Sequence, residues 1–222
     1  MKKVCQLLTM SSMMLVFSGC VSTKPLPLAQ NAIVSSNAKT LKVIQRQQHK
    51  FIIQTPTKAM LNSGLMTAFA VNSLSNDVAI KYHIVDPAVY IREKLATSLA
   101  LKENLIVTQA VETSTTTNID KLSQENASSD LLLDVFTGFW GANYFSLGWG
   151  TYTASHTTTF RLIDTKTRKV ISKGVCKNEP IQKKDGVSYK ELLANNAQWI
   201  KTHFQTSAEA CVTLFEKQAL QI

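Results

Sequence analysis

The sequence lacks the short motifs that mark the commonest catalytic and nucleotide-binding sites. It contains no HExxH, GxSxG, P-loop or GxGxxG pattern. Its four histidines, His49, His83, His156 and His203, are scattered without zinc-ligand spacing. Asp134, in an apolar run, and His156, in a Thr-rich run, are the candidates for catalysis, but the sequence places no partner beside either. We therefore expect no catalytic site, no metal and no cofactor.

Acidic side chains are scarce, with 15 against 24 basic ones, and the formal net charge is +9. Charged residues make up 18% of the chain and hydrophobic residues 45%, which is typical of a globular protein and argues against wholesale disorder. The basic residues form no dense tract with interleaved aromatics, so we do not expect nucleic acid as a partner. The positive balance instead favours anionic neighbours such as lipid head groups or acidic glycans.

Long hydrophobic runs are also missing, and the apolar stretch at the start is too short to span a bilayer. Two lysines precede this stretch, which covers residues 7–17 and is followed by Ser18-Gly19-Cys20. The arrangement resembles the signal peptide and lipobox of bacterial lipoproteins. That resemblance implies a removable signal peptide over residues 1–19 and a Cys20 that carries lipid, including a fatty acid such as palmitate. An ordinary secretory signal cleaved elsewhere is the alternative.

The resemblance also implies a location. Val21 follows the cysteine, whereas an Asp there resembles an inner-membrane retention signal, so we expect an outer-membrane anchor and a domain that faces the periplasm. The lipidated N-terminus and the small, polar residues after it, 20–40, predict a flexible tether. Residues 41–222 are then long enough for a single domain with its own core.

Cysteine is rare, with four residues in the chain. Cys5 lies in the predicted signal peptide and Cys20 at the lipidation site, which leaves Cys176 and Cys211 as one pair in an oxidising compartment. We expect a disulfide between them, which closes a loop of about 35 residues and contributes roughly 3–4 kcal/mol on the chain-entropy model. Two free, buried thiols are the alternative.

Hydrophobic periodicity predicts an α+β fold. Strands are expected over 41–44, 51–53, 104–108, 131–136, 151–163 and 169–176, and helices over 59–74, 86–102 and from 188 onward. Asp86-Pro87 and the Ser188-to-Glu191 capping box are the helix starts. The uncharged 59–74 segment is either a buried helix that Asn76-Asp77 ends or a patch that contacts membrane. This order predicts a mostly antiparallel sheet with helices packed on one face and a long C-terminal helix.

Five large rings and four glycines alternate between residues 138 and 150. The rings are Phe139, Trp140, Tyr144, Phe145 and Trp149. Clustered aromatic side chains anchor interfaces, so this aromatic segment is the candidate partner-binding surface. The alternative is a bent hairpin whose rings fill the protein's own core.

The order of elements over residues 86–215 is similar to that of small envelope lipoproteins, including auxiliary lipoproteins of lipid-transport systems. LLLDVFTGFW in a central strand and FRLIDTKTRKVI in a hairpin carry the similarity. It implies a non-enzymatic accessory role at the outer membrane, with a protein, a lipid or an envelope polymer as partner. A surface-exposed lipoprotein that acts on other cells or a host is the alternative, and a hydrolase that uses Asp134 or His156 is a third.

Overall fold

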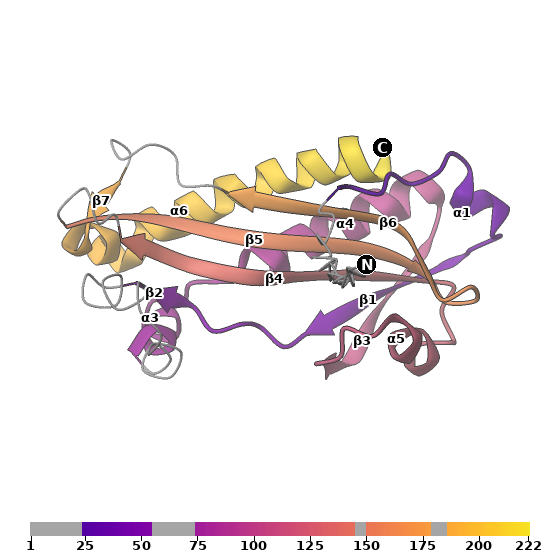
Figure 1. Ribbon diagram of the computed structural model, residues 1–222, viewed down its shortest axis with the longest axis horizontal. Coiled ribbons are helices and arrows are strands. Elements are labelled where there is room, and N and C mark those ends of the chain that lie inside the picture. The colour runs from indigo at the N-terminus through magenta and orange to yellow at the C-terminus, as the bar shows by residue number, and fades with distance from the viewer. Residues whose placement is uncertain (1–23, 55–73, 145–149, 179–185) are drawn as a thin grey trace, which may run out of the picture.

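The computed structural model describes residues 24–54, 74–144, 150–178 and 186–222. In chain order its elements are α1 (Ala32–Ser35), β1 (Thr40–Arg46), β2 (Ile52–Ile53), α3 (Leu74–Tyr82), α4 (Pro87–Glu103), β3 (Ile106–Ser114), α5 (Ile119–Glu125), β4 (Leu131–Tyr144), β5 (Thr151–Asp164), β6 (Lys169–Asn178), β7 (Val187–Ser188), α6 (Tyr189–Phe215) and the π-helical turn η2 (Glu216–Leu220). The long strands β4, β5 and β6 run along the molecule with α6 beside them (Figure 1). The predicted α+β class with a long C-terminal helix is confirmed.

The sheet is mixed rather than mostly antiparallel. Its strand order is β3-β1-β4-β5-β6, with β2 paired to the far end of β4 and β7 paired to β5. The predicted antiparallel arrangement holds for β4, β5 and β6, which are joined in sequence. It is wrong for β1, which runs parallel to both β3 and β4, because the chain returns to the sheet through α4 rather than through a tight turn.

The helices α4 and α6 cover one face of the sheet. Asp86 begins α4 as predicted, since its Oδ1 accepts a hydrogen bond from the backbone N–H of Ala88 at 2.8 Å. The predicted capping box of Ser188 and Glu191 begins α6. Between these helices and the sheet lies the main core, which includes Leu41, Ile91, Leu95, Leu99, Leu131, Leu133, Val135, Phe160, Leu162, Ala208 and Phe215.

The opposite face carries one short helix, α5, so helices are not confined to one face. Leu122 of α5 is buried with Ile44, Leu132 and Ile163 at the end where β4 begins. Beyond α5 the strands present a different set of side chains, which we call the open face. It consists of Asp134, Phe136 and Phe139 of β4 and their cross-strand partners Arg161, Thr159 and Thr157 of β5.

Residues 24–40, predicted as part of a flexible tether, pack on the domain instead. Leu28, Ile33 and Ala38 are buried in the main core. Leu26 forms an isolated antiparallel bridge with Lys173 of β6. The prediction fails because it was based on the polar composition of the segment as a whole. The few apolar side chains in it are widely spaced, and each of them packs on the core.

Two further elements differ from their predicted bounds. The strand expected over 104–108 extends to Ser114, because its parallel pairing with β1 satisfies the backbone even though most of its side chains are exposed. The helix expected over 59–74 lies outside the described residues except at Leu74. Asn76 and Asp77 do not end a helix, since both lie inside α3.

The helix α6 is interrupted over Ala194–Ala197, where Asn195 and Asn196 adopt left-handed backbone angles that asparagine tolerates. The interruption rotates the first turns, so Leu192 is fully buried and Leu193 only partly. After it the expected apolar stripe continues to Cys211, which forms a disulfide with Cys176 of β6 at a Cα–Cα distance of 5.6 Å. This bond ties the C-terminal helix to the last long strand.

Candidate functional site: a cationic cavity beside the open face

Trp140, predicted to bind a partner, is a core residue. Its ring is 3% exposed and packs against Phe51 and Phe204, at centroid distances of 5.0 and 6.0 Å. Its indole Nε1 donates a hydrogen bond to the backbone carbonyl of His49 at 2.7 Å. The register of β4 shifts just before this residue and turns the ring toward the helix-covered face, so its assignment to an interface is wrong.

The other four aromatic residues have different positions. Phe139 is half-buried on the open face, opposite Thr157. Tyr144 is half-buried, and its ring lies 5.4 Å from that of Tyr152. Phe145 and Trp149 lie outside the described residues, as does the predicted lipidation site Cys20. Phe139 and Tyr144 are therefore the two described rings that remain available in part to a partner.

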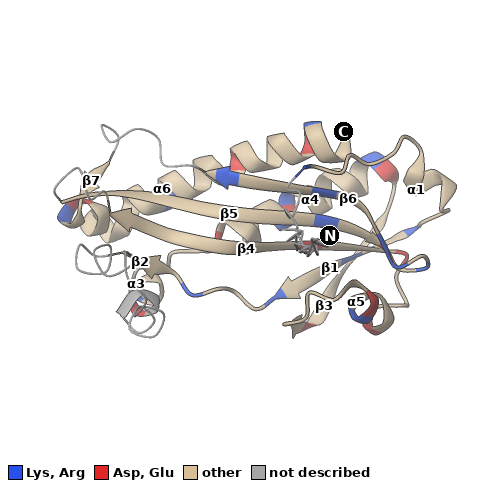
Figure 2. Cartoon of the chain, in the orientation of Figure 1, with Lys and Arg blue, Asp and Glu red and all other residues tan. Residues whose placement is uncertain are grey.

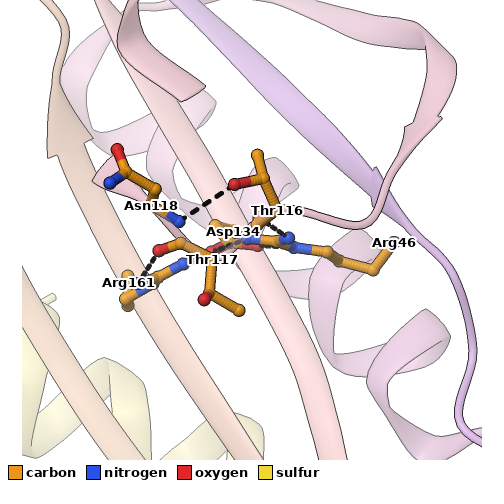
Figure 3. Close-up of polar contacts among 6 residues, drawn as sticks. All are labelled: Arg46, Thr116, Thr117, Asn118, Asp134 and Arg161. Atoms are coloured by element: carbon orange, nitrogen blue, oxygen red, sulfur yellow. Dashed lines mark hydrogen bonds and ion pairs between the residues drawn. The ribbon is translucent and has the colours of Figure 1, made fainter. Parts of the chain in front are cut away.

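The open face is organised by Asp134, which is fully buried between two arginines (Figure 3). Arg46 of β1 donates two hydrogen bonds to the carboxylate, from Nε to Oδ1 at 2.6 Å and from Nη2 to Oδ2 at 2.8 Å. Arg161 of β5 donates two hydrogen bonds to Oδ2 at 2.9 and 2.5 Å. The side chains of the two arginines are 7% and 14% exposed. Such bidentate, charge-assisted pairs are the strong kind, and this one links three adjacent strands.

The arginines also hold the segment that precedes α5. Arg46 donates to the carbonyl of Thr116, and Arg161 donates to that of Thr117 at 3.2 Å. Each guanidinium lies 5.4 Å from the ring centroid of Phe136, one on either side of Asp134's strand. Residues 116–117 are thereby fixed against the sheet, and Thr117 contributes to one wall of a cavity.

That cavity has a volume of about 330 Å³ and is lined by Arg46, Gln47, Gln48, His49, Lys50, Ser114, Thr115, Thr117 and Phe136. No carboxylate lines it. Its cations are Arg46 and Lys50, and the Trp140 hydrogen bond to His49 holds this stretch of chain in place. We call it the cationic cavity. A larger cavity of about 500 Å³ on the β3 side has Lys42 and Lys121 but also Glu112 and Glu125, so its charges balance.

The charge arrangement suits binding rather than acid–base catalysis. Both carboxylate oxygens of Asp134 accept hydrogen bonds from arginines, so neither is free to take a proton from a substrate. His156 is buried on the other face, with its ring nitrogens 2.9 Å from Thr158 Oγ1 and 3.0 Å from Ser207 Oγ. Burial lowers the pKa of His156 to about 4.

Asp86 is a second buried carboxylate, and it has a structural role. Burial raises its pKa, while the hydroxyl of Thr137 donates to it at 2.7 Å. Its other oxygen caps α4, as described above. Among the described residues, no group of three or more His, Cys, Asp or Glu side chains is placed to hold a metal ion.

The sequence identified Asp134 but missed its partners. Arg46 and Arg161 lie 88 and 27 residues away from it along the chain. The one available signal was the polar run Arg46-Gln47-Gln48-His49-Lys50 between two strand predictions, which the structure turns into one side of the cationic cavity.

No family model and no curated protein sequence matches this chain. Among solved structures, it is similar to protein XCC0632 of Xanthomonas campestris, described with family model DUF330, at a TM-score of 0.39 and 9% identity over 80% of this chain and 81% of that one. Lipoprotein GNA1162 of Neisseria meningitidis gives 0.37 and 12%, over 81% and 99%. A PelC dodecamer from Paraburkholderia phytofirmans gives 0.34 and 10%, over 83% and 92%. All three scores are below 0.5, so the likeness assigns no function.

Within the described ranges, no helix combines the length and the apolar character that crossing a membrane requires.

Proposed function

We propose that this protein is a lipid-anchored, non-catalytic binding protein of the outer membrane that faces the periplasm and holds an anionic envelope ligand. The anchor is Cys20, on the strength of the lipobox-like Ser18-Gly19-Cys20. The observation that carries the binding role is the cationic cavity, whose walls include Arg46 and Lys50 and no carboxylate. A site of this kind favours negatively charged groups.

The ligand class follows from the donors in the cavity. The nitrogens of Arg46 are bonded to Asp134 and to the Thr116 carbonyl, so the ammonium group of Lys50 is the cation left to contact a phosphate or carboxylate. Ser114, Thr115 and the two glutamines add neutral hydrogen-bond donors. Phe136 supplies an apolar surface on which a sugar ring, or the part of an acyl chain next to the head group, can lie. An acidic glycan and a phospholipid head group share this chemistry, so the two must be separated by experiment.

Equilibrium binding tests the cavity. The probes are polygalacturonate for carboxylates, inorganic polyphosphate for phosphates, head-group glycerophosphoglycerol for lipid, and neutral dextran as the reference. We expect saturable binding to at least one anionic probe, none to dextran, and weaker binding as salt rises. Lys50→Gln should lower the affinity several-fold, because it removes a cavity charge that takes no part in the Asp134 network.

Lys121→Gln is the matched control, since Lys121 is an exposed lysine of the charge-balanced cavity and forms only a surface pair with Glu125. Equal loss in both variants would mean that binding is diffuse electrostatics. Absence of binding to every anionic probe would overturn the proposed role.

The anchor has its own test. An alkyne fatty acid supplied to growing cells should label the wild-type protein and not Cys20→Ala, and the labelled protein should fractionate with outer membranes. Equal labelling of both proteins would refute lipidation at Cys20.

A further inference from the structure

The N-terminal segment is attached to β6, the last strand of the sheet. Leu26 donates to the carbonyl of Lys173 at 2.9 Å and accepts from its N–H at 3.0 Å. The hydroxyl of Ser172 donates to the carbonyl of Leu26 at 3.1 Å. Two residues on, the N–H of Leu28 donates to the carbonyl of Ala219 in η2 at 2.7 Å. The chain is therefore fixed to the domain at residues 26–28.

Prolines on both sides limit this pairing to one residue. Pro25 and Pro27 have no N–H to donate, so Leu26 is the single residue of the three that can complete a ladder step. The bridge is antiparallel, which means that the chain leading back toward Cys20 leaves in the direction of Lys177.

The distance from the lipid to this bridge is short. Five residues lie between Cys20 and Leu26, and the six Cα–Cα steps of a fully extended chain cover at most about 20 Å. A tether of twenty flexible residues would let the domain turn freely above the membrane, whereas this one holds the β6 edge next to it. A lipid on Cys20 would thus keep the β6 edge of the sheet, rather than the β3 edge, near the membrane.

The charges on that edge match an anionic surface. Lys169, Lys173 and Lys177 recur along β6, and no acidic residue occurs in the strand. Figure 2 shows basic residues along β6 and in the turn before it. Lys177 is exposed and Lys173 half-buried, with side chains on the same side of the strand. Basic residues next to a lipid anchor strengthen its attachment to anionic leaflets.

We infer that the β6 edge, with Lys173 and Lys177, lies against the phospholipid head groups of the membrane that holds the Cys20 lipid. The inference rests on the lipidation put forward under the proposed function. The cationic cavity includes Arg46 of β1, which is three strands from β6 in the sheet order. The cavity therefore lies about 14 Å farther from the bilayer than the β6 edge does. Its ligand is then approached from the periplasmic side rather than from the anchoring leaflet.

Photo-crosslinking tests this orientation without new cysteines that could disturb the neighbouring disulfide. A photoreactive amino acid replaces Lys177 in one protein and Val111 in the other, since Val111 lies on the opposite edge strand β3 and is 99% exposed. Each full-length, lipidated protein is reconstituted in vesicles of phosphatidylethanolamine and phosphatidylglycerol. We expect at least several-fold more lipid crosslinks from position 177 than from position 111, and equal or reversed yields overturn the inference.

Two further arms separate tether length from charge. A Gly-Ser insert of about ten residues after Val21 should bring the yield at 177 down to that at 111. The second arm adds Lys173→Glu to the protein that carries the photoreactive residue at position 177. This substitution should lower the yield of lipid crosslinks on phosphatidylglycerol vesicles but not on phosphatidylcholine vesicles. An unchanged yield in both arms would contradict the inference. Protein without fatty-acid label would refute the proposed anchor itself, whereas lipidated protein with equal crosslinking refutes only the orientation.

Discussion

The two faces of β4 are stabilised in different ways, although their residues alternate along one strand. Leu131, Leu133 and Val135 point toward α4 and α6 and belong to a continuous apolar core. Asp134 and Phe136 point the other way, where Arg46 and Arg161 enclose the carboxylate. The helix-covered face gains stability from apolar burial, which is non-directional. The open face depends on a few directional ion pairs, which fail together if one partner is lost.

The largest effect should come from removing the charge at the centre of the open face. Asp134→Ala leaves two mostly buried guanidinium groups without their counterion, and we expect a loss of roughly 3–5 kcal/mol in the free energy of unfolding, measured by urea denaturation. Replacing all three charges with apolar residues, Arg46→Met, Asp134→Leu and Arg161→Met, should be far less costly. If the triple variant is as unstable as Asp134→Ala, the loss comes from the missing ion pairs themselves and not from buried charge left without a counterion.

A similar loss is expected on the helix-covered face from Trp140→Ala. It removes a ring packed against Phe51 and Phe204 and should cost roughly 3–5 kcal/mol. Tyr144→Ala, at a half-buried ring, is the control and should cost clearly less. Equal small effects in thermal unfolding would return Trp140 to the partner-binding surface.

Reduction of the Cys176–Cys211 disulfide should sharpen the contrast further, because it removes the covalent link between β6 and α6. Cys211→Ser should lower stability by roughly 2–4 kcal/mol. Mass mapping under non-reducing conditions should recover the two peptides linked in the wild type. Recovery of both thiols alkylated from oxidised native protein would show that the pair is free.

A pH dependence that is absent at neutral pH and develops only in acid arises on the helix-covered face. Because burial lowers the pKa of His156 to about 4 from 6.5, the unfolded chain binds a proton that the folded one does not between these pH values. This contribution to stability is complete above pH 6.5 and is lost at roughly 1.4 kcal/mol per pH unit as the pH falls toward 4.

His156→Gln cannot titrate, so its unfolding free energy should fall less steeply than that of the wild type over the same window. His203, whose pKa burial also lowers, remains in both proteins, and its charge adds to the lowering of the His156 pKa. Parallel pH profiles would mean that folding does not lower the pKa of His156.

Local signals in the sequence were sufficient for several elements. The start of α4 at Asp86, the turn between β5 and β6 and the capping box of α6 are formed by residues within a few positions of one another. Hydrogen bonds between such near neighbours form whatever the rest of the chain does, and for that reason sequence patterns predict them. The pairing of Cys176 with Cys211 followed from elimination among four cysteines.

The candidate site was not predictable in the same way. Asp134 was visible as a carboxylate in an apolar run, but Arg46 and Arg161 become its partners only when β1 and β5 flank β4 in a particular register. The burial of Trp140 depends on a one-residue register shift, which reverses the face of every later side chain in the strand. Composition over 20–40 indicated flexibility, whereas single residues such as Leu28 and Ile33 decided the packing.

The sequence by itself determined the elements that local hydrogen bonding and periodicity specify and the α+β class, and the lipid anchor stays a prediction from it. Tertiary structure alone decided which side chains meet: the Arg46–Asp134–Arg161 cluster, the wall of the cationic cavity and the attachment of Leu26 to β6. The physical reason is the separation along the chain between the residues that make contact. Periodicity records which face of an element is buried, but strand order and register bring together residues as far apart as Leu26 and Lys173, and no local pattern encodes that meeting.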